Sequence, residues 1–194
     1  MRYPPDQKAK AREALLQAGM RSMKTTGFNG IGVDGLAAEA GVTSGAFYSN
    51  FRNKEAMLQA IISSAGCEPV LGKSEAAGKG ELQGQLRTFL DTYLGVEHVE
   101  GVADGCPMPA LSADVARAGE ETRAAYERNL TTWVDRIADC LDGPRRDRER
   151  RAWSIVSLMV GAVTIARAMA EPDTQAKVVG SVRRAADRLI APPG

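Results

Sequence analysis

The segment GVTSGAFYSNFRNKEAML, residues 41–58, is the part of this chain that decides how it folds. Its first half crowds glycines, aromatic residues and small hydroxyl residues into one short stretch. A helix in a protein core would favour Leu and Ala there, and a helix on an ordinary surface would favour Glu and Lys. The composition therefore indicates a segment that contacts something other than its own core.

The residues around this segment predict two short helices, about 33–40 and 44–50, joined by a tight turn at Gly41 and Val42. Apolar residues flank the turn on both sides, and they are Leu36, Ala37, Val42, Phe47 and Phe51. Two short helices around a glycine turn outline a helix-turn-helix, in which the first helix supports a second that lies in the DNA major groove.

The start of the second helix carries side chains that suit a DNA contact. Thr43 can cap this helix, and the hydroxyls of Thr43 and Ser44 can reach phosphate oxygens or base edges. Gly45 permits a close approach to the DNA backbone, and Tyr48 offers a ring for a thymine methyl group and a hydroxyl for phosphate. The candidate DNA-contacting residues are Thr43, Ser44, Gly45, Tyr48, Ser49, Asn50 and Lys54. The alternative is that the small residues serve only tight packing.

Residues 27–58 resemble the DNA-binding domain of TetR-family transcriptional regulators. The family pattern runs roughly G-F-x-x-x-[ST]-[IV]-x-x-[IL]-A-x-x-A-G-V-[ST]-x-G-x-[FL]-Y-x-[HN]-F-x-x-K-x-x-L, and the chain follows it at the same spacing as far as Lys54, with Met57 at the last position and Leu58 after it. Gly32 departs from it, because the family has a Ser or Thr there that caps the helix and touches phosphate. Asn50 replaces the commoner His.

The resemblance implies an all-α, nine-helix fold. A helix-turn-helix DNA-binding domain would occupy residues 1–62, and an effector-binding and dimerisation domain residues 63–194. The expected partners are double-stranded operator DNA, a second copy of the chain in a homodimer, and an unknown small-molecule effector. No cofactor, metal or membrane is implied.

Composition and charge are compatible with this interpretation. The chain has 194 residues, 44% of them apolar, and a net charge of only +1. Residues 1–60 carry eight Lys and Arg against five Asp and Glu, which favours an anion-facing N-terminal part. No signal peptide and no apolar run of about 18 residues is found, so a cytoplasmic protein is expected.

The rest of the chain reads as helices, because no segment alternates apolar and polar residues for long. A first helix ends near Gly27, and Asn53 is placed to cap a fourth one. A stretch rich in glycine, 63–82, predicts a frayed helix end and a linker. Later helices are expected at about 81–98, 108–118, 120–141, 146–170 and 173–190.

Several sequence patterns are typical of enzymes, but the residues around them in this chain do not support an enzymatic role. GIGVDG, residues 30–35, matches a dinucleotide-binding pattern, but that pattern has meaning only after a strand, and a helix precedes it here. His98 is the only histidine, which argues against histidine-rich metal sites and histidine-activated nucleophiles. The cysteines Cys67, Cys106 and Cys140 are odd in number and far apart, unlike a disulfide framework.

The larger domain is expected, from the resemblance, to hold the dimer interface and the effector pocket. Two helical stripes suit a pair of helices that would form a four-helix bundle about a two-fold axis, and their candidate interface residues are Ile155, Met159, Val163, Val179 and Val182. The alternative is that these residues form only the core of one chain. The candidate pocket residues are Phe89, Tyr93, Cys106, Met108, Tyr126 and Trp133, although aromatics at helical spacing also suit ordinary core.

Cys106 begins a predicted helix, where the positive end of the helix dipole would favour a thiolate. The surrounding DGCPMPALSADVAR resembles the TetR subgroup related to the repressor of N-ethylmaleimide reductase, some members of which sense electrophiles or oxidants through this cysteine. In others the cysteine is structural, and both roles stay open here.

The sequence thus predicts a sequence-specific DNA-binding regulator, a repressor released from its operator by a small-molecule or electrophile effector. One alternative is a small-molecule carrier or enzyme that uses the C-terminal helical cavity without DNA. Another is an architectural DNA binder without sequence preference, against which the near-neutral charge argues.

Overall fold

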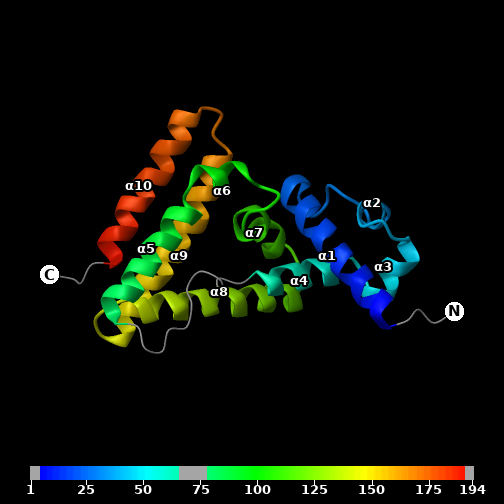
Figure 1. The fold of residues 1–194 in the computed structure, drawn as a ribbon, viewed down its shortest axis with the longest axis horizontal. Coiled ribbons are helices and arrows are strands. Elements are labelled where there is room, and N and C mark those ends of the chain that lie inside the picture. Colours follow the sequence, from blue (N-terminus) through cyan, green and yellow to red (C-terminus); the bar gives the residue numbers. More distant parts are fainter. Residues whose placement is uncertain (1–4, 66–77, 191–194) are drawn as a thin grey trace. The chain divides into compact units, whose positions relative to one another are not determined.

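The computed structural model describes residues 5–65 and 78–190, which fold almost wholly as α-helix (Figure 1). Within these ranges no strand occurs, which confirms the all-α prediction. Cys67 and most of the expected linker lie outside the described residues. The helices of the described part are α1 (Pro5–Thr26), α2 (Val33–Glu39), α3 (Ser44–Asn50), α4 (Lys54–Ser64), α5 (Lys79–Tyr93), α6 (Val96–Glu100), α7 (Met108–Ala116), α8 (Glu120–Cys140), α9 (Arg145–Arg167) and α10 (Pro172–Ile190).

The prediction of a single helix at about 81–98 is wrong, because the structure has two helices there, α5 and α6. The last helical bond of α5 runs from Leu94 N to Leu90 O, and Gly95 then takes an extended conformation that begins α6. Glycine has a low helix propensity, so the break falls where the chain gains least from continuing. His98 strengthens it, because its Nδ1 lies 2.6 Å from the carbonyl oxygen of Tyr93.

Contacts divide the chain into two compact units. Unit 1 joins the described residues of 1–65 to 102–127, and unit 2 joins those of 66–101 to 128–194. The division falls within α8, whose first residues belong to unit 1 and whose remainder belongs to unit 2. The functional domains expected at 1–62 and 63–194 stay a prediction.

Unit 1 is built on the helix-turn-helix. Its core consists of side chains that are fully buried, among them Leu15, Met23, Leu36, Phe47, Met57, Leu58, Ile61 and Ile62. The turn between α2 and α3 uses Gly41 at φ 66°, a conformation that suits glycine, with bonds from Gly41 N to Ala38 O and from Val42 N to Ala37 O. This helix end fixes the angle at which α3 leaves α2.

Unit 2 contains α5, α6, α9 and α10 with the larger part of α8. The last two helices, α9 and α10, run side by side along their length (Figure 1). The core of this unit includes the buried residues Leu86, Phe89, Leu90, Trp133, Ile137, Ile155, Met159, Val163, Ala186 and Ile190. Gly143, at φ 106°, and the following Pro144 turn the chain from α8 into α9.

Candidate DNA-binding site and effector regions

Two side chains cap the helices of the candidate DNA-binding site. The Oγ1 atom of Thr43 accepts a hydrogen bond from Ala46 N at 3.2 Å and begins α3. The Oδ1 atom of Asn53 accepts from Ala56 N at 2.8 Å and begins α4. Both predicted caps are confirmed, and they hold a short helix whose own length would not stabilise it.

Tyr48 is the most exposed large side chain of α3. It is 60% exposed, and its ring meets the ring of Phe47 edge to face at a centroid distance of 5.4 Å. Phe47 is fully buried and Phe51 nearly so, and both belong to the core of unit 1. A buried aromatic thus supports an outward one, and the geometry leaves the Tyr48 ring available to a partner.

Ser49 and Asn50 turn their polar groups back onto their own helix. The Ser49 hydroxyl donates to Ala46 O at 2.8 Å, and the Asn50 amide donates to the same oxygen at 2.8 Å. Arg12 of α1 donates to Asn50 O at 3.1 Å and lies 4.5 Å from the Phe51 ring centroid. These contacts close the C-terminal end of α3, and the DNA contacts of Ser49 and Asn50 stay a prediction.

Lys54 already has contacts within the chain. Its ammonium donates to Ile31 O at 3.0 Å and lies 4.4 Å from the centroid of the Phe28 ring. It therefore holds the loop between α1 and α2 next to Gly32, which begins α2 without a side-chain cap. Its contact with phosphate stays a prediction.

Ser44 reveals a residue that sequence reasoning missed. Its hydroxyl donates to the Oδ1 atom of Asp34 at 2.5 Å, so the first residue of α3 is joined to the first turn of α2. Asp34 is exposed. The only signal in the sequence was an acid near a helix start, which ordinarily indicates no more than a favourable dipole interaction.

No charged side chain lies on α3, whose sequence is SGAFYSN. Base contacts from this helix must therefore come from hydroxyls, the Asn50 amide, the backbone and the Tyr48 ring. The nearest exposed cation along the chain is Arg52, which forms an ion pair of 2.6 Å with Glu121 of α8.

The beginning of α8 rests on the start of α4 within unit 1. Glu55 Oε1 accepts from Gly119 N at 2.7 Å and from Thr122 Oγ1 at 3.2 Å. A carboxylate at a helix N-terminus is favoured by the helix dipole. A Cβ atom on Gly119 would come within 2.8 Å of that carboxylate oxygen, so this contact depends on glycine. The ion pair of Arg52 with Glu121 joins the same two parts of the chain, the start of α4 and the start of α8.

The six predicted pocket residues fall into two groups, one in each unit. In unit 2, the Trp133 ring meets those of Phe89 and Tyr93 edge to face at centroid distances of 6.1 and 6.0 Å. All three side chains are buried, with at most 5% of their surface exposed. They form one aromatic cluster, and a role in binding an effector stays a prediction.

The other three residues lie in unit 1. Met108 is fully buried, and the Tyr126 hydroxyl lies 2.8 Å from Ser112 Oγ. The Cys106 sulfur is half-buried and accepts from Met108 N at 3.4 Å. A backbone N–H at the start of α7 therefore points at this sulfur, an arrangement that favours a thiolate. Lys24, itself buried, donates to the neighbouring Gly105 O at 2.6 Å and ties this loop to α1.

The candidate dimer residues divide by burial. Ile155, Met159 and Val163 are 0% exposed in a single chain, because their stripe of α9 packs into the core of unit 2. Their burial supports the alternative role, the core of one chain, and a part for them in a dimer interface stays a prediction. Val179 and Val182 on α10 are half-exposed and stay interface candidates.

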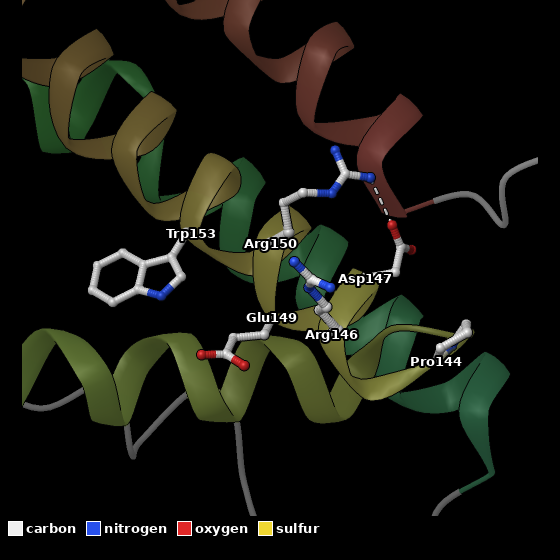
Figure 2. Close-up of a pocket in the computed structure, with 6 residues that line it drawn as sticks. All are labelled: Pro144, Arg146, Asp147, Glu149, Arg150 and Trp153. Atoms are coloured by element: carbon white, nitrogen blue, oxygen red, sulfur yellow. Dashed lines mark hydrogen bonds and ion pairs between the residues drawn. The ribbon is translucent and has the colours of Figure 1, made fainter.

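The exposed side of α9 begins beside a shallow groove of about 710 Å³, shown in Figure 2. The groove is lined by Pro144, Arg146, Asp147, Glu149, Arg150 and Trp153. Arg150 donates to Asp147 at 2.6 Å, and this hydrogen bond is the main cause that lowers the pKa of Asp147. This ion pair compensates two of the four charged side chains that line the groove, and Trp153 is its exposed apolar element.

The described residues can be checked for a metal site and for a membrane-spanning helix. In that part of the chain no three His, Cys, Asp or Glu side chains gather where they could hold a metal ion. None of the helices described is long and apolar enough to cross a membrane.

The capped recognition helix, its glycine turn and the two-unit helical architecture define a helix-turn-helix DNA-binding regulator. Residues 15–61 match the family model for bacterial regulatory proteins of the tetR family, and residues 83–182 match that for the tetracyclin repressor-like C-terminal domain. The chain belongs to the TetR family, whose members are transcriptional regulators that bind operator DNA and act as dimers.

Curated relatives have the same kind of function in their names. The HTH-type transcriptional repressor NemR of Escherichia coli K12 is 28% identical over 138 residues, 70% of this chain and 69% of NemR. The transcriptional regulator AcuR of Cereibacter sphaeroides is 29% identical over 130 residues, 66% of this chain and 59% of AcuR.

Solved structures agree in fold. The reduced form of E. coli NemR superposes with a TM-score of 0.76 at 22% identity, covering 95% of this chain and 98% of that one. The regulatory protein TetR from Rhodobacter sphaeroides has a TM-score of 0.75 at 22% identity, covering 93% and 99%. The prediction of a DNA-binding transcriptional regulator is confirmed.

Proposed function

We propose that this chain is a cytoplasmic, homodimeric repressor, with no enzymatic activity of its own, that binds a two-fold operator and leaves it when an effector binds. The observation that carries this proposal is α3: a helix capped by Thr43, anchored by the buried Phe47 and presenting the exposed Tyr48. Two copies would place their α3 helices in successive major grooves of a near-palindromic site.

The dimer would form on the exposed side of α9 and the flank of α10. Trp153, Ser157 and Thr164 recur at helical spacing on α9 and are exposed, and the position of Gly161 between them has open space. Val179 and Val182 supply half-exposed apolar surface on α10. This face replaces the fully buried stripe as the proposed interface.

The effector would act through the larger domain, with the aromatic cluster around Trp133 or the loop of Cys106 as its place of action. Two contacts could carry its effect to DNA, because Glu55 bonds the start of α8 and Lys24 bonds the loop before Cys106. Weakening operator binding about 100-fold needs only about 2.7 kcal/mol of differential effector binding, within the usual range of allosteric coupling.

Fluorescence anisotropy tests the proposal on a duplex from the region upstream of the chain's own gene, at about 150 mM salt with excess unrelated DNA. The expected result is specific binding that Tyr48→Ala weakens about tenfold or more, while thermal unfolding stays unchanged. Val96→Ala, which trims another exposed apolar side chain (63% exposed) in unit 2, is the matched control and should bind normally.

The same assay tests the effector. Addition of diamide or N-ethylmaleimide should release the wild-type chain and not Cys106→Ser if the thiol is the sensor. Release of both proteins would exclude Cys106 as the sensor and indicate another thiol, Cys67 or Cys140. Release of neither would leave the aromatic cluster as the candidate place of action. If Tyr48→Ala binds DNA as well as the wild type, or if it unfolds, α3 does not present Tyr48 as proposed.

A further inference from the structure

A single side-chain hydrogen bond joins the two helices of the helix-turn-helix on their exposed side. Ser44 is the first residue of α3, and its hydroxyl donates to Asp34 Oδ1 of α2 at 2.5 Å. Among the described residues, Ser44 is the only partner of this carboxylate. The carboxylate is therefore exposed yet fixed in position, at the place where α3 begins.

The location of Ser44 determines where this carboxylate would lie in a complex. In helix-turn-helix proteins the first residues of the second helix approach the base edges. A side chain bonded directly to Ser44 must then reach the same depth of the groove. Because the Ser44 proton is already donated to Asp34, the pair presents only hydrogen-bond acceptors to the DNA.

Electrostatics limits what such a group can meet. Phosphates repel a carboxylate, and α3 carries no cation that could offset this repulsion. The position is favourable only where a base offers a hydrogen-bond donor. In the major groove guanine offers O6 and N7 and thymine offers O4, all acceptors, whereas cytosine offers its N4 amino group and adenine its N6 amino group.

We infer that Asp34, positioned by Ser44, reads a base amino group in each half-site and selects cytosine there. Adenine is the poorer match, because its N7 acceptor stands beside N6 and would face the second carboxylate oxygen. Cytosine has a C–H group at the corresponding place. The inference rests on the proposed function, since it assigns a specificity-determining residue to the same DNA-binding surface.

Selection from a library of randomised duplexes, followed by sequencing, tests this with the full-length chain. The wild type should prefer cytosine at one half-site position by about fivefold or more over each other base. Asp34→Ala should flatten the preference at that position alone. Asp34→Asn should move it to adenine, because an amide can pair with both N6 and N7.

Two controls distinguish base selection by Asp34 from the loss of an acidic charge and from a loss of folding stability. Glu127→Ala removes an exposed acid from α8, outside the helix-turn-helix, and should keep the cytosine preference. Thermal unfolding of Asp34→Ala should match the wild type, and if it does not, Asp34→Asn supplies the decisive profile. Removing a charge that merely repels DNA would strengthen binding to every sequence equally.

The outcomes are distinct. If Asp34→Ala and Asp34→Asn both select the wild-type base profile, Asp34 does not read DNA and the inference is wrong, while the proposed function stands. If the wild type selects no sequence at all, specific operator binding fails and the inference falls with it.

Discussion

Polar side chains are used in opposite ways by the helix-turn-helix and by the end of unit 2 where α8, α9 and α10 meet. In the first region the bonds that cap α3 and α4 are local: Ala46 N donates to Thr43 Oγ1 and Ala56 N donates to Asn53 Oδ1, three residues away in each case. Its longer bonds, from Arg12 to Asn50 O and from Lys54 to Ile31 O, fasten the ends of the short helices. In the second they cross the unit: Arg151 reaches Leu189 O, 38 residues away, and Lys79 reaches Asp139 O, 60 residues away.

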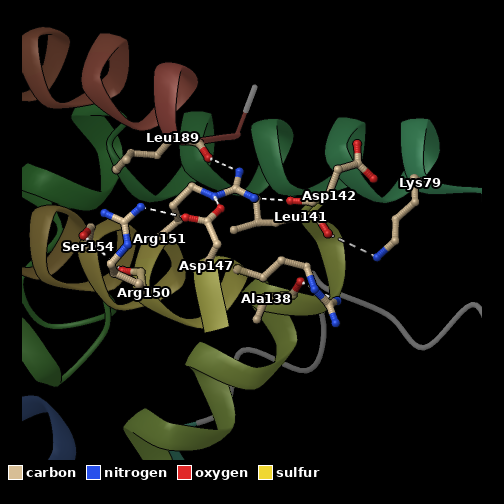
Figure 3. A network of polar contacts seen from close by, with 10 residues as sticks. Lys79, Ala138, Leu141, Asp142, Asp147, Arg150, Arg151, Ser154 and Leu189 are labelled. Carbon is tan, nitrogen blue, oxygen red and sulfur yellow. Dashed lines mark hydrogen bonds and ion pairs between the residues drawn. The ribbon is translucent and has the colours of Figure 1, made fainter. Parts of the chain in front are cut away.

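Figure 3 shows the polar contacts at this end of unit 2, which supply hydrogen-bond donors to the carbonyl groups where α8 ends. The carbonyl groups at the C-terminal end of α8 have no partner within their own helix. Arg148 donates to Ala138 O, Lys79 donates to Asp139 O and Leu141 O, and Arg151 donates to Asp142 O. Cations also suit the negative end of a helix dipole. These positive charges therefore stabilise the unit and are not available to DNA.

The helix-turn-helix does the reverse, since its local bonds stabilise two short helices and leave the outer face of α3 uncovered. A surface built for a partner needs its geometry fixed from within. The comparison predicts that substitutions at the end of unit 2 affect stability, whereas those on the outer face of α3 affect recognition.

The largest expected effect belongs to Arg151. Its side chain is 5% exposed and bonds Asp147, Leu189 O and Asp142 O. Arg151→Met would leave two carbonyls without their donor and Asp147 with Arg150 as its remaining partner, at a cost of about 3 kcal/mol in the free energy of unfolding. Urea unfolding followed by tryptophan fluorescence measures this in the right unit, because Trp133 and Trp153 both lie in unit 2.

Arg150→Met is the matched control for Arg151. Arg150 lies one residue earlier on α9 and also bonds Asp147, but its side chain is 74% exposed. We expect a loss of less than about 0.5 kcal/mol, as for other exposed ion pairs. Equal losses for the two variants would show that burial and the long-range bonds do not distinguish them.

A middle-sized effect is expected at Asn53. Asn53→Ala removes the cap of α4 and should lower stability by about 1 kcal/mol, whereas Asn53→Ser keeps a capping oxygen and should recover most of it. Helical circular dichroism would show the loss, while the tryptophan transition of unit 2 should hold its midpoint. A shift of both transitions together would mean that the two units unfold as one.

The same contrast explains how much could be predicted from the sequence. The caps at Thr43 and Asn53 and the turn at Gly41 were predictable, because each is a local pattern with a fixed spacing. The Ser44–Asp34 bond was not, since it joins residues ten apart whose approach depends on the angle between two helices.

Unit 2 was harder to predict for the same reason. The apolar stripe of Ile155, Met159 and Val163 indicated a packed face of α9 but not whether the partner was the same chain or a second copy. Nothing in the periodicity distinguishes the two. Likewise, a segment as rich in arginine as 145–151 reads as a solvated face until the carbonyl groups that Arg148 and Arg151 contact are known.

The smallest effect expected is a change in acid stability through Asp147. The hydrogen bond from Arg150 lowers the pKa of Asp147 below its ordinary 3.8, more than partial burial raises it. A carboxyl group whose folded pKa is depressed contributes stability that is present above the unfolded pKa and is lost as pH falls through the folded one. The loss should therefore appear below pH 3.8, as a steeper fall of Tm with decreasing pH.

Arg150→Met tests this contribution without removing the carboxylate, because it takes away the bond that lowers the pKa most and leaves the bonds of Arg151 in place. The fall of Tm between pH 5 and 2.5 should become shallower by roughly a degree or less, because Tm at pH 7 drops by about that amount for an exposed pair while Tm at the acid end stays near that of the wild type. An unchanged slope would assign the depressed pKa to the buried Arg151 instead. The exposed side of α9 would then owe its acid stability to the same long-range contacts that hold the end of unit 2 together.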